Sequence, residues 1–206
     1  NIAPAARKLD RIRYEEMLEL ASLGAKVLQI RSVEFAMKYR VPLWVKSSFS
    51  DDPGTLVCEE DATMEDLVVS GIALDRNEAQ ISVRNVPDRP GIAAQIFGAL
   101  DEKAIVVDLI VQNPPLGGKS DLTFTVGKAD LTKAHDVVKK VAKALDAGDI
   151  STDQEIAKVS IVGVGMRNHS GVAARMFRTL STEGINIMAI STSEIRVSCV
   201  IPSKYA

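Results

Sequence analysis

A short turn ahead of a predicted helix holds the residues best suited to binding chemistry. Residues 88–91 read Asp-Arg-Pro-Gly and lead into the small and apolar run IAAQIFGAL. The first backbone N–H groups of a helix lack partners within it and form the positive end of its dipole, so they can hold a carboxylate. Gly91 lets a ligand approach the backbone closely, and Asp88 or Asp108 could bind an ammonium group. Donors for a carboxylate beside an acceptor for an ammonium group are the minimum for an amino-acid pocket.

The same residues also allow a purely structural interpretation. Gln112 and Asn113 end the strand expected after this helix, where their amides would add to a binding site. In the structural interpretation Asp88 only caps the helix and Asp108 is an exposed strand residue. The residues alone leave both interpretations open.

The turn belongs to a segment that the chain repeats. VPDRPGIAAQIFGAL spans residues 86–100, and GMRNHSGVAARMFRTL spans residues 165–180. Glycine, alanine, phenylalanine and leucine recur at an offset of 80 residues, as between Gly91 and Gly171. A fixed offset that continues from the helix into the next strand indicates a duplicated module.

No other pattern points to catalysis or to a metal. His135 lies on the polar side of a predicted helix and is interpreted as a solvated surface residue, while His169 lies in a loop, where a loop or capping role is favoured. GVGMRNHSG lacks the third glycine of a dinucleotide-binding motif, and the sequence has no phosphate-binding loop and no metal-ligand spacing. Cys58 and Cys199 lie in strand-like runs and are expected to be reduced thiols. We therefore expect no catalytic residue and no metal site in this chain.

The composition is that of an ordinary globular protein. The chain has 206 residues, is 46% hydrophobic and 25% charged, and carries a net charge of −2. The sequence therefore lacks the excess of basic residues that is typical of nucleic-acid-binding proteins. No apolar run reaches the ~18 residues of a membrane-spanning helix, and no signal peptide opens the sequence. We expect a cytoplasmic protein without a nucleic-acid or membrane partner.

Residues 1–60 have the pattern of an α/β piece without a complete core of its own. Tyr14–Tyr39 has helical spacing, and Gly24 is expected to separate two helices or to allow close packing. VPLWVKSSF and GTLVCEE predict short strands around the turn SDDPG. The acidic segment Glu60–Asp66 is expected to be a linker.

The first module is expected over residues 67–150. AQISVRNV predicts a strand, the helix follows, AIVVDLIVQN predicts a buried strand, NPPLGGKS a flexible loop and DLTFTV a paired strand. DLTKAHDVVKKVAKAL predicts an amphipathic helix with Asp130 as its N-cap. Residues 156–163 could close this module as well as open the next. The order is the split βαβ pattern of a ferredoxin-like fold.

The second module is expected over residues 151–206 and repeats the pattern incompletely. AKVSIVGV, a helix from about Gly171, INIMAIST and EIRVSCVI follow in order, and the sequence stops where the first module begins its second helix. We therefore expect a truncated second module and a chain that is part of a longer polypeptide. The polar stretch STSEI, residues 191–195, is either a tight strand connection or a second ligand wall.

Taken together, these segments resemble the C-terminal part of the bacterial aspartokinases, which phosphorylate the side-chain carboxylate of aspartate. EEMLELASLGAKVLQIRSVEFAMKY and VPLWVKSSF with PGTLV resemble the end of the amino-acid-kinase catalytic domain. The repeated segments with VDLIVQN and ISTSEI resemble two ACT domains. The resemblance implies an α/β (α+β) chain in which tandem ferredoxin-like βαββαβ ACT domains follow the tail of an amino-acid-kinase domain.

The resemblance also implies where effectors bind. ACT domains of this family pair side by side and bind lysine, threonine or both at helix-start loops and strand interfaces. Val106 is a departure, because relatives often have Asn there and Val offers only backbone groups. The matched motifs give as effector residues Asp88, Gly91, Ile92, Ala93, Val107, Asp108, Gln112 and Asn113 in the first module, and Val172, Ala173, Asn186, Ile187, Thr192, Ser193 and Glu194 in the second.

For the full-length enzyme the resemblance implies ATP with Mg²⁺ as cofactor and L-aspartate as substrate. Lys26, in GAKVLQ, matches a family lysine near the nucleotide. The lysine- and glycine-rich opening segment of the family, which carries most ATP and aspartate contacts, is absent from the sequence. The regulatory part is therefore expected to require no cofactor and to be inactive alone.

The resulting interpretation is the regulatory part of an aspartate kinase that makes 4-phospho-L-aspartate, the first step toward lysine, threonine and methionine. Effector binding would shift the population toward an arrangement that disfavours catalysis. ACT pairing implies a homo-oligomer, or assembly with a longer catalytic subunit. Two alternatives stay open: a separate non-catalytic ACT-type regulatory subunit, and a dimerisation module that binds no amino acid.

Overall fold

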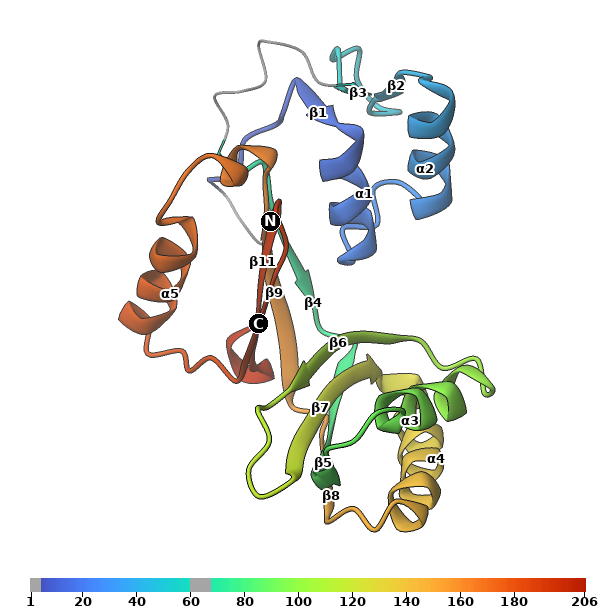
Figure 1. The fold of residues 1–206 in the computed structure, drawn as a ribbon. Helices are drawn as coiled ribbons and strands as arrows, with labels where there is room; N and C mark the ends of the chain where they lie inside the picture. The colour runs from blue at the N-terminus through green and yellow to red at the C-terminus, as the bar shows by residue number, and fades with distance from the viewer. Residues whose placement is uncertain (1–4, 60–67) are drawn as a thin grey trace. The chain divides into compact units, whose positions relative to one another are not determined.

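The computed structural model describes residues 5–59 and 68–206 and divides the chain into two compact units (Figure 1). The N-terminal unit comprises residues up to Asp75 together with Val159–Asn186 and Ile190–Cys199. The central unit comprises Arg76–Lys158, Ile187–Ala189 and Val200–Ala206. The linker expected at Glu60–Asp66 lies outside the described residues.

The N-terminal unit begins with a small α/β piece. Its elements are β1 (Arg11–Arg13), α1 (Tyr14–Ser22), α2 (Ile30–Tyr39), β2 (Leu43–Val45) and β3 (Thr55–Cys58). The strand order is β1-β3-β2, with β3 parallel to β1 and antiparallel to β2. The two predicted helices and the two predicted strands are confirmed. The strand β1 was not predicted, because three residues are too few to reveal an alternating pattern.

This piece does not form a core from its own residues alone. Tyr14, Val33 and Val57 are buried together with Ala73 of the following strand, β4 (Gly71–Asp75), and with Val162, which comes from a strand much later in the chain. The expectation that residues 1–60 lack a complete core is therefore confirmed, and the piece depends on the second module for burial.

The rest of the N-terminal unit contains most of the second module. Its sheet has the order β10-β11-β9-β4. The strand β4 (Gly71–Asp75) precedes the whole first module in sequence, so the elements of the first module are inserted between two neighbouring strands of this sheet. The other elements of the second module are β9 (Ile156–Val162), the 3₁₀ turn η2 (Val164–Arg167), α5 (Val172–Thr182), β10 (Ala189–Thr192) and β11 (Arg196–Pro202). The strands β9, β10 and β11 have residues in both units, and the 3₁₀ turn η3 (Ser203–Tyr205) belongs to the central unit.

The central unit contains the first module and has the predicted βαββαβ order. Its elements are β5 (Glu78–Pro87), α3 (Ile92–Asp101), β6 (Val107–Gln112), β7 (Lys119–Gly127), the 3₁₀ turn η1 (Lys128–Asp130), α4 (Leu131–Ala144) and β8 (Ile150–Asp153). The strand order is β6-β7-β5-β8, and all neighbouring pairs are antiparallel.

Three details of the first module differ from the sequence-based expectations. The closing strand is β8, which pairs with β5, whereas residues 156–162 form β9 in the other sheet. The strand β6 was expected to be buried but lies at a sheet edge, where Ile110 is 51% exposed. Asp130 occupies the N-cap position of α4, but its side chain makes no capping hydrogen bond, because η1 leads directly into the helix.

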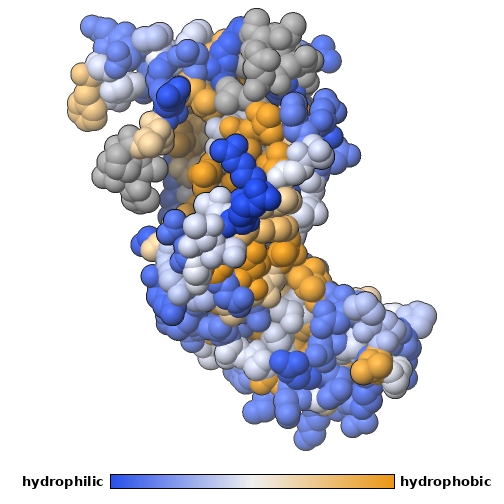
Figure 2. Space-filling view, turned by 90° about the vertical axis from the view of Figure 1, so that its left-hand side faces the viewer, coloured by the Kyte–Doolittle hydropathy of each residue, from blue (hydrophilic) through white to orange (hydrophobic). Residues whose placement is uncertain are grey.

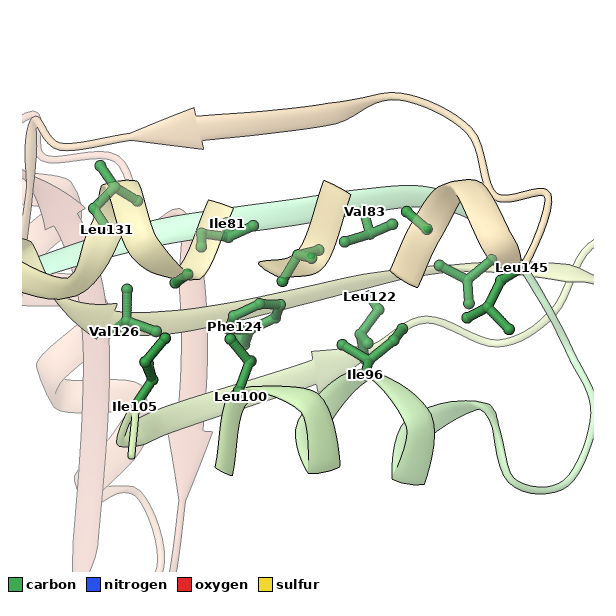
Figure 3. Packing of buried hydrophobic residues seen from close by; sticks show 14 of the residues in the cluster. Ile81, Val83, Ile96, Leu100, Ile105, Leu122, Phe124, Val126, Leu131 and Leu145 are labelled. Atoms are coloured by element: carbon green, nitrogen blue, oxygen red, sulfur yellow. The ribbon is translucent and has the colours of Figure 1, made fainter. Parts of the chain in front are cut away.

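Helices α3 and α4 bury one face of the central sheet. Ile96 and Leu100 from α3 point toward Ile81 and Phe124 from the strands, and Leu131 of α4 reaches the same core (Figure 3). The rings of Phe97 and Phe124 meet edge to face with centroids 5.4 Å apart, a favourable aromatic geometry. This core fixes the start of α3 relative to the ends of β5 and β6.

Some hydrophobic side chains remain at the surface of the described residues (Figure 2). No helix in the described ranges is long and apolar enough to cross a membrane.

Cys199 is fully buried, and this burial raises the pKa of its thiol to about 11. The thiol therefore stays protonated and unreactive at neutral pH.

We expect Phe124→Ala to lower the free energy of unfolding by about 3–5 kcal/mol, because the change leaves a cavity in the core of the first module, where Phe124 is fully buried. Urea denaturation monitored by circular dichroism measures this loss. Val106→Ala is the control, since Val106 is 78% exposed and its truncation should change stability by less than about 0.5 kcal/mol. Equal losses in the two variants would contradict the assigned core.

Candidate effector site

The two repeated turns have the same backbone conformation. Gly91 is the N-cap of α3 with φ 91°, and Gly171 is the N-cap of α5 with φ 90°. Both values lie in the left-handed region that favours glycine. Neither helix has a side-chain cap, so Asp88 does not cap α3. The shared geometry supports the duplication inferred from the sequence and leaves both helix starts open to a ligand.

A pocket of about 390 Å³ opens at the start of α3. It is formed by the turn before the helix, the end of β6 and the start of β7. Val107, Asp108 and Asn113 do not line it. The predicted effector residues that it brings together are Asp88, Gly91, Ile92, Ala93 and Gln112.

Ser120 also lines this pocket and was missed from the sequence. The Gln112 amide nitrogen donates to the Ser120 hydroxyl at 3.4 Å, and Ser120 is buried. The amide oxygen of Gln112 is thereby the remaining acceptor for a ligand N–H. NPPLGGKS was interpreted as a flexible loop, but Gly117 and Gly118 form a tight turn with positive φ and Ser120 is already in β7. The paired glycines were the available signal for a hairpin.

Asp121 positions the turn from the opposite face of β7. Its carboxylate accepts from the Arg84 guanidinium at 3.0 Å and from the Asn85 backbone N–H at 2.9 Å. At this point the pairing of β5 with β7 shifts register between Val83 and Val86, which marks a bulge. The bulge redirects β5 into the turn at Asp88, whose N–H donates to the Gly118 carbonyl at 2.9 Å.

Asp108 contacts a buried lysine rather than the pocket, although its own side chain is 42% exposed. Its carboxylate hydrogen-bonds the ammonium group of Lys158, which also donates to Glu78 at 2.8 Å. Lys158 is buried; burial by itself lowers its pKa, but the bonds to Asp108 and Glu78 outweigh this effect, so that the pKa is raised overall. Contact between Asp108 and a ligand therefore stays a prediction.

The predicted residues of the second module lie at corresponding places. Val172 and Ala173 begin α5, and Thr192 ends β10. Glu194, in the turn to β11, pairs with Arg167 at 3.1 Å, and both side chains are largely exposed. The remaining residues are Ser193 in the same turn, and Asn186 and Ile187 in the segment between α5 and β10. Of this set only Ile187 belongs to the central unit.

Lys26 and the two histidines do not line the pocket at the start of α3. Lys26 is exposed with φ 49° in the segment after α1. The imidazole Nδ1 of His169 lies 2.8 Å from the Gly165 carbonyl, so this side chain has the loop role favoured from the sequence. His135 lies on α4 beside Asp136. The described part of the chain contains no cluster of three or more histidine, cysteine or acidic residues that could hold a metal ion.

Comparisons with known proteins agree with this architecture. The ACT domain model matches residues 79–145, and a second ACT domain model matches residues 159–206. The regulatory subunit of aspartate kinase from Thermus thermophilus, in its ligand-free form, is 41% identical with a TM-score of 0.64, over 68% of this chain and 92% of that one. The chain belongs to the aspartokinase family. The resemblance seen in the sequence and the tandem ACT fold are thereby confirmed.

Two further relatives extend the match over the N-terminal piece. The aspartokinase of Pseudomonas aeruginosa is 53% identical over 206 residues, which cover 99% of this chain and 50% of that protein. Aspartokinase III of E. coli, solved with lysine and aspartate in the T-state, is 26% identical with a TM-score of 0.73, over 98% of this chain and 44% of that one. The chain thus spans about half the length of the curated relatives it matches.

We expect Lys158→Met to lower the free energy of unfolding by about 3–5 kcal/mol, because it leaves the buried Glu78 carboxylate without its counter-charge. The second oxygen of Glu78 is already buried without a hydrogen-bond partner among the described residues. Urea denaturation measures the loss, with the exposed Lys139→Met as control. Lys158→Met with Glu78→Gln should recover part of the stability, and no recovery would contradict this account.

The same network predicts a pH dependence. The pKa of Lys158 is raised above its ordinary value of 10.5 in the folded state. Its contribution to the free energy of unfolding is therefore complete below that value and is lost as pH rises through the folded pKa. The stability difference between the wild type and Lys158→Met should therefore be constant from about pH 7 to 10 and shrink above that range. Denaturation curves across this range check it, and shrinkage already near pH 8 would contradict the raised pKa.

Proposed function

We propose that this chain is the amino-acid-sensing regulatory part of an aspartate kinase. The observation that carries the proposal is the pocket that unites Asp88, the open start of α3 and Gln112. Aspartokinase relatives and the two ACT domain matches support a regulatory role in this family. The full-length enzyme would phosphorylate L-aspartate to 4-phospho-L-aspartate with ATP and Mg²⁺, and Lys26 would lie near its nucleotide.

The pocket has complementary groups for both ends of an amino acid. The N–H group of Ala93 in the first turn of α3 would hold the carboxylate, since no side chain caps this helix. The N–H of Ile92 already donates to the Arg89 carbonyl, at 3.4 Å, and Ile92 would contribute its side chain to the pocket wall. The Asp88 carboxylate and the Gln112 amide oxygen would accept hydrogen bonds from the ammonium group. Gly91 has no heavy atom near its missing Cβ, so the ligand can approach the backbone there. The side chain of the effector would then extend along the pocket toward Leu122.

Lysine, threonine or both are the proposed effectors. The E. coli enzyme solved with lysine supports an amino-acid effector in this family. In the second module, Glu194 would bind a cationic group such as a lysine side chain, together with Thr192 and Ser193. Binding would favour one arrangement of paired ACT modules and so lower kinase activity by a coupling of about 1–3 kcal/mol.

Pairing of ACT modules is the proposed route to a homo-oligomer in the cytoplasm. Val106 is 78% exposed, and Ile110, which is half-exposed, lies on β6 at the edge of the central sheet. Apolar residues on a sheet edge support association with another strand. The partner would be a second copy or a longer catalytic subunit.

A separate regulatory subunit is the second candidate. The Thermus thermophilus subunit supports it, because that chain is called a regulatory subunit and 92% of it is covered. The kinase-type piece before β4 favours the first candidate, since its core includes Ala73 and Val162 from the ACT region. A free sensor would not need that piece.

We expect isothermal titration of this chain to detect binding of lysine, threonine or both. Asp88→Asn and Gln112→Ala should weaken that binding at least about tenfold, the effect of losing one hydrogen bond to a charged group. Asp101→Asn is the control, because this change also removes one carboxylate, at the far end of α3. Unchanged affinity in Asp88→Asn and Gln112→Ala would contradict the site. Absence of binding by a folded wild-type chain would favour a dimerisation module.

A further inference from the structure

Two carboxylates on α1 connect the N-terminal α/β piece (β1 to β3) directly to the loops of the second module. Glu16 and Glu19 are three residues apart, so they lie on neighbouring positions of one helix face. All the contacts described next lie within the N-terminal unit. Neither residue belongs to a motif that predicted a role for it.

Glu16 is buried and joins three segments of the chain. Its Oε1 atom accepts from the backbone N–H of Val164 at 2.9 Å and from the hydroxyl of Ser70. Its Oε2 atom accepts from the backbone N–H of Arg13 at 3.3 Å. Val164 begins η2, which leads through Arg167 into the turn before α5. A charged carboxylate with three donors and little solvent contact is strongly held.

Glu19 holds the other loop. Its carboxylate accepts from the Arg196 guanidinium at 3.1 Å, and both side chains are about three-quarters buried. Arg196 begins β11, immediately after the turn of Ser193 and Glu194. Its backbone oxygen accepts from the N–H of Ser193 at 2.8 Å, which closes that turn.

The two loops are also joined to each other. The N–H of Gly163 donates to the Ile195 carbonyl at 2.9 Å, and Arg167 pairs with Glu194. Gly163 has no room for a side chain, because a Cβ would lie 2.2 Å from the Val68 carbonyl oxygen. The loops before α5 and after β10 are therefore joined to each other as well as to α1.

At its C-terminal end, α1 leads directly into the segment that contains Lys26. Leu23 is buried, and the N–H of Ala25 donates to the Leu20 carbonyl at 3.0 Å, closing the end of the helix. Lys26 follows directly with a positive φ. A shift of α1 would therefore reposition this segment.

We infer that Glu16 and Glu19 are positioning residues that transmit the ligand state of the second-module loops to α1 and the Lys26 segment. This inference rests on the proposed function, because it needs an effector that changes those loops. It goes beyond that function in naming the residues that carry the signal. Neither carboxylate needs to touch the effector.

Hydrogen exchange measured by mass spectrometry on this chain tests the inference, with lysine or threonine added, whichever binds by calorimetry. In the wild type, the effector should change exchange in the peptide Tyr14–Gln29. Glu19→Gln and Glu16→Gln should each largely abolish that change, while affinity stays within about threefold of the wild type.

Two controls separate coupling from a general loss of structure. Glu15→Gln removes the same charge from an exposed position of α1 and should leave the effector-dependent change intact. Glu19→Arg combined with Arg196→Glu reverses the ion pair and should restore the change that Glu19→Gln loses.

Three results would overturn the inference. The first is effector binding without any change in Tyr14–Gln29, and the second is a full change in both Glu16→Gln and Glu19→Gln. Either leaves the proposed function standing, because calorimetry reports binding independently. The third is absence of binding to the folded wild-type chain, which overturns the proposed function and the inference together.

Discussion

The left-handed glycine at the start of each first helix is the constraint on which the candidate site depends. At φ near 90° the chain turns into α3 or α5 without a side-chain cap, so N–H groups of the first helical turn have no side-chain partner. A residue with a Cβ would be strained by about 1–2 kcal/mol there, although space around Gly91 is open. Backbone conformation, rather than crowding, thus explains why glycine recurs in both modules and why the neighbouring polar residues can differ.

The elements that the sequence predicted correctly are those with long periodic patterns. Helix α4 and strand β7 carry clear apolar spacing, and their buried residues face one core. The strands β1 and β8 have three and four residues, so local pattern could not identify them. The placement of β4 beside β9 depends on pairing across the entire first module, which no local pattern reveals. The domain limits at residues 67–150 and 151–206 remain a prediction. The strand β4 falls within the first of these ranges but pairs with β9 of the second.

The candidate site was predictable to the extent that it depends on local geometry. Asp88, Gly91 and Gln112 were found because a helix start and the end of its neighbouring strand meet at one edge of a sheet. Ser120 was missed because its position depends on a hairpin. A contact between Asp108 and a ligand stays a prediction, but the hydrogen bond from Lys158, fifty residues away in the chain, to the Asp108 carboxylate was not foreseen. A lysine inside the apolar run AKVSIVGV was the available signal, since a buried ammonium group requires acidic partners.

The hydrogen bonds of Glu16 and Glu19 have energies in the range of allosteric coupling. A hydrogen bond to a charged group is worth about 1.5–3 kcal/mol, which is the range of ordinary allosteric coupling, about 1–3 kcal/mol. The contacts of Glu16 with Val164 and of Glu19 with Arg196 each fall in this class. Losing one of them would therefore shift a conformational equilibrium by about tenfold or more while the cores around Val57 and Phe124 stay intact. A regulatory chain needs this combination, because a signal carried by the cores themselves would cost the stability of the fold.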